Sequence, residues 1–182
     1  MEIDRRKVIK TAIVTSVAAP FAILLGCGEA EFVDRRLKFT SLSEALKEAE
    51  ELVSRNIILP ETVFSLPQTL IHCAQSIEYS MSGFPESKSS LFQNTLGSAA
   101  FSVFSWRGRM SHNLTEEIPG APKMRSDVDA TAALERLHTS VKLFHDSNEP
   151  FQPHFAYGQL NRSEYELAHA LHLANHFSSI DG

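Results

Sequence analysis

The segment 161–180 constrains the fold more than any other stretch of the sequence. It reads NRSEYELAHALHLANHFSSI and contains no proline or glycine, so it should form one continuous helix. At about 100° per residue, Tyr165, His169, His172 and His176 fall on one stripe of that helix. Leucine, alanine and phenylalanine cover much of the remaining circumference, which predicts a buried helix. Because an unpaired buried polar group costs roughly 1–3 kcal/mol, these imidazoles need partners.

Two of these histidines have the spacing of a metal site. His172 and His176 are i and i+4 on the helix, which separates their Cβ atoms by about 5–6 Å and lets two ring nitrogens reach one ion at ~2.0–2.1 Å. His72 is the candidate third ligand because it lies on a polar stripe of another predicted helix. It can face the interior only if that helix is buried nearly all round. A hydrogen-bonded polar pocket is the alternative to a metal ion. The candidate neighbours or alternative ligands are His169, Tyr165 and His154.

Five segments have helical patterns, and no segment has the alternation of a strand. Helices are expected over 42–55, 66–82, 89–106, 127–145 and 161–180. Ser163 and Glu166 have the S-x-x-E spacing of a capping box at the start of the last helix. Leu96 and Val103 are among the apolar residues that predict deep burial of the third helix. The sequence therefore predicts an all-α protein in which four long helices form an antiparallel bundle, with the first or third helix splayed from it.

Two long loops connect the later helices. Residues 107–125 follow the third helix, and residues 148–159 precede the last one. The first loop is long enough to cover another part of the molecule, although irregular packing would also explain it. His112 and His154 lie in these loops, where they could approach a substrate. An ordinary loop histidine is the alternative for each of them.

Residues 1–26 have the pattern of an export signal. The stretch DRRKVIK at 4–10 follows the twin-arginine pattern, and an uncharged apolar run then leads to LLGC, which resembles a lipobox. In a lipobox the cysteine, here Cys27, is lipidated and becomes the new N-terminus. The run is shorter than the ~20 apolar residues of a membrane-spanning helix. An uncleaved N-terminal anchor is the alternative, but either way we expect an exported protein held at a membrane, in the periplasm or at the cell surface.

The predicted export signal divides the chain into three parts. We expect a twin-arginine-type lipoprotein signal peptide at 1–26, a tether at 27–38 and a helical bundle at 39–182. Cleavage removes four of the 17 basic and two of the 22 acidic residues, which leaves 13 and 20 and a net charge of −7. A domain this acidic has no electrostatic reason to bind nucleic acid or anionic lipid. With Cys27 lipidated, Cys73 is the remaining thiol, so a structural disulfide is not expected.

A second metal pattern competes with the three-histidine hypothesis. Glu135-x-x-His138 and Glu166-x-x-His169 both fit the E-x-x-H unit of di-iron bundles. However, Glu135 points away from the apolar face of its helix, and Glu166 lies off the histidine stripe. The three-histidine site is therefore the favoured interpretation. The sequence has no G-x-S-x-G nucleophile motif and no G-x-x-x-x-G-K phosphate loop.

Three short motifs, taken in order, resemble the DinB/YfiT-like superfamily, and most closely a domain-of-unknown-function branch of exported bacterial proteins. They are TLIH at 69–72, HFAYGQL at 154–160 and H-x-x-x-H at 172–176, within a similarity that spans roughly 39–180. The resemblance implies a four-helix bundle and a three-histidine site for a divalent ion, usually zinc or nickel. By position the ligands are His72, His172 and His176. Characterised relatives include metal-dependent thiol transferases and isomerases with low-molecular-weight thiol cofactors, and the export signal sets this chain apart from them.

Two functional hypotheses follow from these features. The first is a membrane-tethered lipoprotein that acts as a metal-dependent hydrolase or transferase on an unidentified small molecule, with the ion lowering the pKa of a bound water or thiol. The second is a non-catalytic lipoprotein whose bundle binds a ligand or a protein partner. A stoichiometric ion with an open coordination position separates the two. Because ligation requires neutral imidazoles, the sequence also predicts that metal affinity falls below about pH 6.5.

Overall fold

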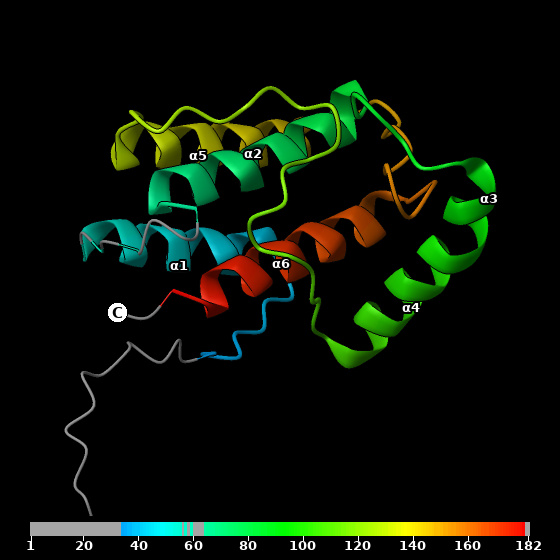
Figure 1. The fold of residues 1–182 in the computed structure, drawn as a ribbon, viewed down its shortest axis with the longest axis horizontal. Coiled ribbons are helices and arrows are strands. Elements are labelled where there is room, and N and C mark those ends of the chain that lie inside the picture. The colour runs from blue at the N-terminus through cyan, green and yellow to red at the C-terminus, as the bar shows by residue number, and fades with distance from the viewer. Residues whose placement is uncertain (1–33, 56, 58, 60–63, 181–182) are drawn as a thin grey trace, which may run out of the picture. The chain divides into compact units, whose positions relative to one another are not determined.

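The computed structural model describes residues 34–55, 57, 59 and 64–180 (Figure 1). The predicted signal peptide and the predicted lipidation site Cys27 lie outside the described residues. Within the described part the secondary structure is helical and contains no strand, which confirms the all-α class. One isolated antiparallel bridge joins His154 and Gly158. None of the described helices is both long enough and apolar enough to cross a membrane.

Six α-helices and one π-helical turn make up this structure. They are α1 (Leu42–Ser54), α2 (Leu66–Ser82), α3 (Ser90–Phe92), the π-helix η1 (Gln93–Gly97), α4 (Ser98–Arg107), α5 (Ala130–Asp146) and α6 (Arg162–Ser178). Side-chain caps explain where the long helices begin. Ser41 caps α1, Asp129 caps α5, and Ser65 forms a reciprocal capping box with Gln68 in α2. Each cap satisfies backbone N–H groups that have no partner inside the helix.

The predicted capping box of the last helix is wrong by two residues. The N-cap is Asn161, whose side chain accepts a hydrogen bond from the backbone N–H of Glu164, while the Glu164 carboxylate accepts from the N–H of Asn161 at 2.8 Å. Asparagine is as good an N-cap as serine, so the earlier of two overlapping patterns starts the helix. Glu166 instead accepts a hydrogen bond from the backbone N–H of Leu42 at the start of α1. The predicted cap residue therefore joins two helices.

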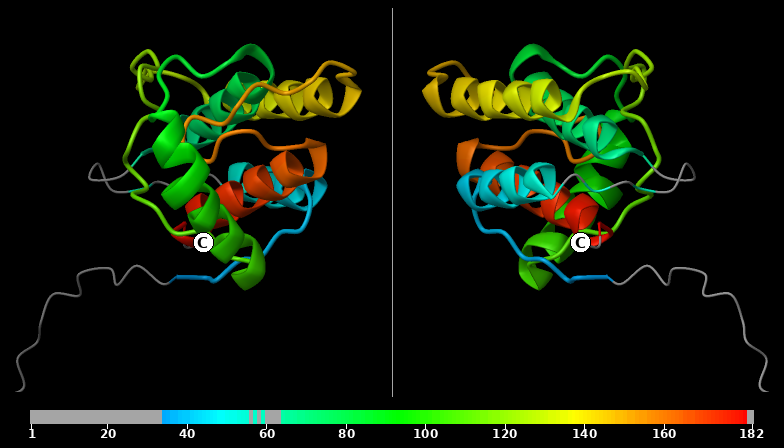
Figure 2. Two further views of the ribbon diagram at one scale, coloured as in Figure 1. Left: turned by 90° about the vertical axis from the view of Figure 1, so that its right-hand side faces the viewer. Right: turned by 90° about the vertical axis from the view of Figure 1, so that its left-hand side faces the viewer.

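The long helices pack in pairs. Helix α2 lies along α5, and α1 lies along α6, as the two side views of Figure 2 show. Helix α2 also packs against α6, so it has neighbours on several sides. Every residue of α2 from Thr69 to Ile77 is buried. Helix α2 is therefore buried nearly all round along this stretch. This is the condition under which His72 can face the interior although it lies far from the main apolar face.

The predicted helix 89–106 is interrupted, and its predicted deep burial is wrong. It divides into α3, η1 and α4, and the side chains of Leu96 and Trp106 are 68% and 86% exposed. Its apolar residues are spread around the helix and do not form one stripe, so only one side can pack. That side contains Gly97 and Phe101, both buried, and Phe101 stacks on Tyr157 at 5.5 Å. Among the long helices, α4 packs against α6.

The end of the predicted tether lies against α6. The backbone N–H of Arg35 donates to the carbonyl of Ser178, and the N–H of Leu37 donates to the Ser178 hydroxyl, both at 2.9 Å. Arg35 also pairs with Glu48 of α1 at 2.6 Å. These contacts hold the segment 35–37 beside the C-terminal end of α6.

Candidate metal centre

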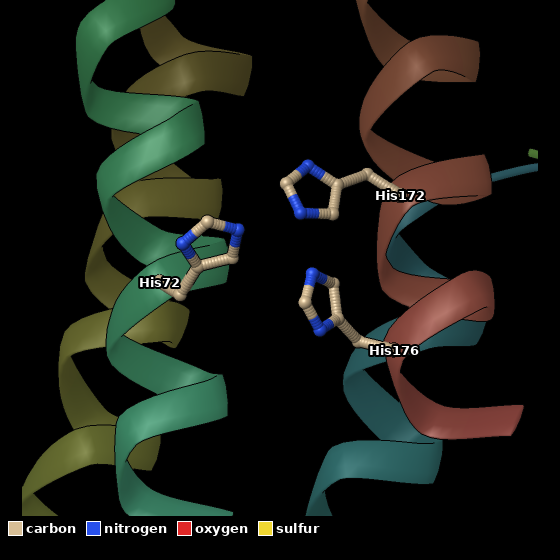
Figure 3. A group of neighbouring side chains, drawn as sticks. All are labelled: His72, His172 and His176. Atoms are coloured by element: carbon tan, nitrogen blue, oxygen red, sulfur yellow. The ribbon is translucent and has the colours of Figure 1, made fainter. Parts of the chain in front are cut away.

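Helices α2 and α6 bring three histidines together. His72 projects from α2 toward His172 and His176 on α6 (Figure 3). The centroid of the His72 ring is 5.0 Å from that of His172 and 4.8 Å from that of His176, and the two α6 rings are 4.8 Å apart. One ring nitrogen from each residue lies within 4.8 Å of the other two. Two features form the cluster. His172 and His176 lie one helical turn apart on α6, and the His72 side chain points toward them from α2.

These three rings are neutral, and each has a buried nitrogen without a hydrogen-bond partner among the described residues. His72 Nδ1, His172 Nε2 and His176 Nε2 are buried and have no hydrogen-bond partner in the described part of the chain. Burial lowers the pKa of His72 to about 4 and the pKa of His172 and His176 well below the usual value, and the neighbouring rings contribute to each shift. The imidazoles therefore keep their lone pairs at neutral pH. Proton competition for a metal should begin well below the pH of about 6.5 expected from sequence.

A divalent ion fits this arrangement. With metal–nitrogen bonds of 2.0–2.1 Å, two ligand nitrogens of a tetrahedral ion lie ~3.3 Å apart. Nitrogens that now lie within 4.8 Å of one another would therefore approach by up to about 1.5 Å on binding. Neutral imidazole suits zinc, nickel and copper. Ligation would give one nitrogen of each ring a partner, and a buried polar group without a partner carries the cost of an unmade hydrogen bond. The structure thus contains three histidines that could hold a metal ion.

A loop between α4 and α5 adds a fourth histidine to the cluster. The His112 ring centroid is 5.0 Å from those of both His172 and His176. Its Nδ1 lies 2.9 Å from the carbonyl oxygen of Asn113. In the sequence His112 was one of two loop histidines with no helical spacing to mark it, so its place beside the cluster could not be predicted.

A cavity of about 220 Å³ adjoins the cluster. His72, His112 and His172 contribute to its lining, and so do His154 and His169. Most of its wall is apolar. The apolar lining residues are Met110, Ile118, Pro119, Phe155, Ala156, Tyr157 and Ala168. A small molecule in this cavity would therefore contact both the histidine cluster and a largely apolar surface.

The loop before α6 fixes the His154 ring within this cavity lining. His154 Nδ1 accepts hydrogen bonds from the backbone N–H groups of Ala156 and Tyr157 at 3.1 and 3.2 Å. The proton of the neutral ring must then be on Nε2. The ring also stacks on Tyr157 with centroids 4.2 Å apart. His154 thus keeps one N–H donor for a ligand in the cavity.

The other two predicted neighbours differ in their roles. His169 is 1% exposed and lines the cavity, and its Nε2 has no partner among the described residues. The Tyr165 hydroxyl donates to the carbonyl of Gln152 at 2.6 Å, and Tyr165 does not line the cavity. Tyr165 therefore ties α6 to the preceding loop.

The competing E-x-x-H pattern is not assembled. His138 pairs with Glu50 at 3.0 Å, and His145 pairs with Glu166 at 2.9 Å, all on partly exposed side chains. In the described ranges, one group of three or more potential metal ligands lies close together, and it consists of His72, His172 and His176. Glu135 and His169 do not take part in it.

Replacing Tyr165 with phenylalanine should lower the free energy of unfolding by about 1–2 kcal/mol, because the carbonyl of Gln152 loses its donor. Urea unfolding measures this change. Tyr79→Phe is the matched control, since no hydrogen bond of the Tyr79 hydroxyl is seen among the described residues. Equal stability of the two variants would contradict the assigned role. Metal content should be the same in both.

The metal-free protein should lose stability as the pH falls below neutral. Burial lowers the pKa of both His154 and His169 to about 3, whereas unfolded histidine titrates near 6.5. Between these values the unfolded state binds more protons, so the stabilisation is complete above pH 6.5 and is lost as the pH falls toward 3. The expected loss from pH 6.5 to 5 is about 1–2 kcal/mol per histidine. Urea unfolding of chelator-treated protein at pH 7 and 5 tests this, with His169→Gln reducing the loss and His138→Gln leaving it unchanged.

These features define a helical protein with a clustered three-histidine site beside a cavity. A family model described as "Protein of unknown function (DUF1569)" matches residues 33–181. The chain belongs to this family. Searches of the curated proteins and of the solved structures each found no match.

Proposed function

We propose that this protein is an exported, membrane-tethered lipoprotein with a divalent metal centre at His72, His172 and His176, and that it acts as a metal-dependent hydrolase or transferase. The observation that carries the proposal is the cluster of three neutral imidazoles. Each has a buried nitrogen without a partner in the described part of the structure, and each offers a ring nitrogen within 4.8 Å of those of the other two. Zinc and nickel are the leading candidates for the ion. Three histidine ligands also leave a coordination position for an incoming group, as in catalytic sites.

The fold supports a DinB-like four-helix bundle. The four long helices α1, α2, α5 and α6 pack as two adjoining pairs. The three motifs that resemble the superfamily fall in α2, in the loop before α6, and in α6 itself. The family match over 33–181 covers the same part of the chain.

The surroundings of the cluster suit chemistry on a small molecule. A bound divalent ion would supply Lewis acidity, which lowers the pKa of a coordinated water or thiol. Residues such as Met110 and Tyr157 offer apolar surface for a bound substrate to pack against. The N–H of His154 is placed to hydrogen-bond a polar group of that substrate. Binding and orientation are thus the roles of the chain's own residues.

The proposed address rests on the sequence. Arg5 and Arg6 precede an apolar run that ends at Cys27, and the membrane partner would be reached through lipid on that cysteine. Mass spectrometry of the mature protein should find an acylated Cys27 as its first residue. An N-terminus at Met1 on a chain without lipid would rule out this part of the proposal. The acidic domain is not expected to bind nucleic acid.

One observation favours a second candidate function, a non-catalytic lipoprotein that binds a partner. The segment from α3 to α4 exposes several large apolar side chains, among them Leu91 (77%) and Trp106 (86%). Large exposed apolar side chains are typical of interaction sites, where a partner buries them. A partner that covers these side chains would not need the histidine cluster.

The two candidates differ in what the cluster binds. Protein purified from its own compartment, without a histidine tag or chelator, should contain one divalent ion per chain by elemental analysis. After exchange to cobalt(II), azide should change the visible absorption spectrum because an enzyme-like centre admits an external ligand. A chain without a stoichiometric ion would favour the partner-binding candidate.

A further inference from the structure

We propose that His112, on the loop between α4 and α5, is a fourth and exchangeable ligand of the metal centre. This inference rests on the proposed metal centre and extends it. His172 and His176 are held by α6, and His72 is held by α2. His112 comes from a loop, so it can enter and leave the coordination sphere without disturbing the helices.

The hydrogen bond of the His112 ring supports a ligand role. A carbonyl oxygen can only accept, so the contact of 2.9 Å between Nδ1 and the Asn113 carbonyl requires the proton on Nδ1. In the neutral ring the lone pair is then on Nε2. Metal-binding histidines commonly donate the N–H of one ring nitrogen to a carbonyl or carboxylate while the other nitrogen binds the ion. His112 already has this arrangement.

The position of the ring supports the same role. Its centroid is 5.0 Å from those of both His172 and His176, the same separation as between His72 and His172. The nitrogens of His112 are nevertheless not among those that lie within 4.8 Å of one another. Ligation thus needs a further small approach of the His112 ring. This difference distinguishes an exchangeable ligand from the three helix-borne ones.

The loop is built to present this side chain. Met110 and Ile118, on either side of His112, are buried. The segment between them contains a turn in which the Asn113 side chain accepts hydrogen bonds from the N–H and the hydroxyl of Thr115. The backbone around His112 is therefore anchored, while the residue itself is exposed to solvent.

Exchange of His112 would also connect two hollows. His112 and Met110 line both the cavity of about 220 Å³ and a second one of about 320 Å³, which contains Arg107, Arg109 and Asn175. A donor atom of an incoming molecule would replace His112 Nε2 on the ion. The His112 ring would then leave its position between the two cavities. Without an incoming molecule, His112 would fill the fourth coordination position. When a molecule binds, its donor atom would fill that position.

The test uses the full-length chain in detergent, with zinc and azide as probes. His112→Ala should weaken zinc binding by about 10-fold, a smaller loss than for the helix-borne ligands, because one exchangeable ligand is removed. In the cobalt(II) protein the same change should tighten azide binding, because azide no longer competes with an imidazole. His138→Ala is the matched control and should change neither value. Thermal unfolding of the metal-free variant should show a folded protein with a cooperative transition, so that a weaker zinc affinity reports the lost ligand.

A second pair of variants separates ligation from packing. Glutamate and glutamine have the same size, but a carboxylate is the better metal ligand, so His112→Glu should retain more zinc affinity than His112→Gln. The inference is overturned if His112→Ala leaves zinc and azide affinity unchanged. It is also overturned if zinc affinity is unchanged and azide binds more weakly, since His112 would then contact the incoming ligand and not the ion. A wild-type chain that binds no ion would overturn the proposed function itself, which is a distinct result.

Discussion

Replacing His172 with alanine should lower the affinity of the chain for a divalent ion by more than about 100-fold. Zinc binding to four-ligand structural sites releases about 10–16 kcal/mol, so one ligand contributes roughly 3–4 kcal/mol. His172 lies beside all the other rings of the cluster, with centroids at 5.0, 4.8 and 5.0 Å from those of His72, His176 and His112. Competition with a chromophoric chelator measures the change. The variants His72→Ala and His176→Ala should show losses of the same order.

Two histidines on α5 provide the controls for this experiment. His138 and His145 form ion pairs with Glu50 and Glu166 on partly exposed side chains. Alanine at either position should leave metal affinity within about two-fold of the wild type, since neither contacts the cluster. Equal losses in the His172 and His138 variants would show that the ion is bound elsewhere.

Replacing Gly97 with alanine should destabilise the protein by more than about 3 kcal/mol or displace the segment from α3 to α4. A Cβ atom at this position would lie 1.8 Å from the carbonyl oxygen of Ala156. The position of a Cβ atom is fixed by the backbone, and its neighbour here is a backbone carbonyl, so no side-chain rotation relieves the clash. Overpacking costs about 1–3 kcal/mol even where side chains can move. Urea unfolding gives the free energy change.

A neighbouring residue on the exposed side of the same segment is the control for Gly97. Ser102 is exposed on α4, and Ser102→Ala should change the free energy of unfolding by less than about 0.5 kcal/mol. Gly97→Ala should also loosen the loop that carries His154, because Ala156 belongs to it. If Gly97→Ala is as stable as Ser102→Ala, the close packing of this loop on η1 is wrong.

The elements that could be predicted from sequence are those set by local patterns. The ends of α2 follow from the Ser65 cap and from Gly83 after the last turn. The pairing of His172 with His176 follows from helical spacing alone. Local patterns could not decide between Asn161 and Ser163 as the N-cap of α6, because each is followed three residues later by a glutamate and so fits a capping box.

Other features depend on packing that the sequence does not display locally. Leu96 and Val103 predicted burial, but an apolar residue on a helix has no preferred side until a neighbour covers it. In the structure, Gly97 and Phe101 lie on the side of this segment that packs against the protein, and Leu96 remains exposed. Composition therefore identified an apolar helix without identifying its contacts.

The histidine cluster combines both kinds of information. His72 could be proposed from a polar stripe and from the resemblance, but its inward orientation depends on α2 being covered by α5 and α6. His112 had neither a helical spacing nor a motif to single it out. Its place beside His172 and His176 is decided by the path of a loop anchored at Met110 and Ile118. Long-range loop geometry of this kind has no short sequence signature.

The most direct test of the metal centre is anomalous diffraction from crystals of the zinc-loaded protein, recorded above and below the zinc absorption edge. One strong anomalous peak per chain is expected between α2 and α6, at ~2.0–2.1 Å from a ring nitrogen of each of His72, His172 and His176. An anomalous peak at another place, or no peak between these helices in crystals whose protein contains one zinc per chain, would contradict the proposed metal centre.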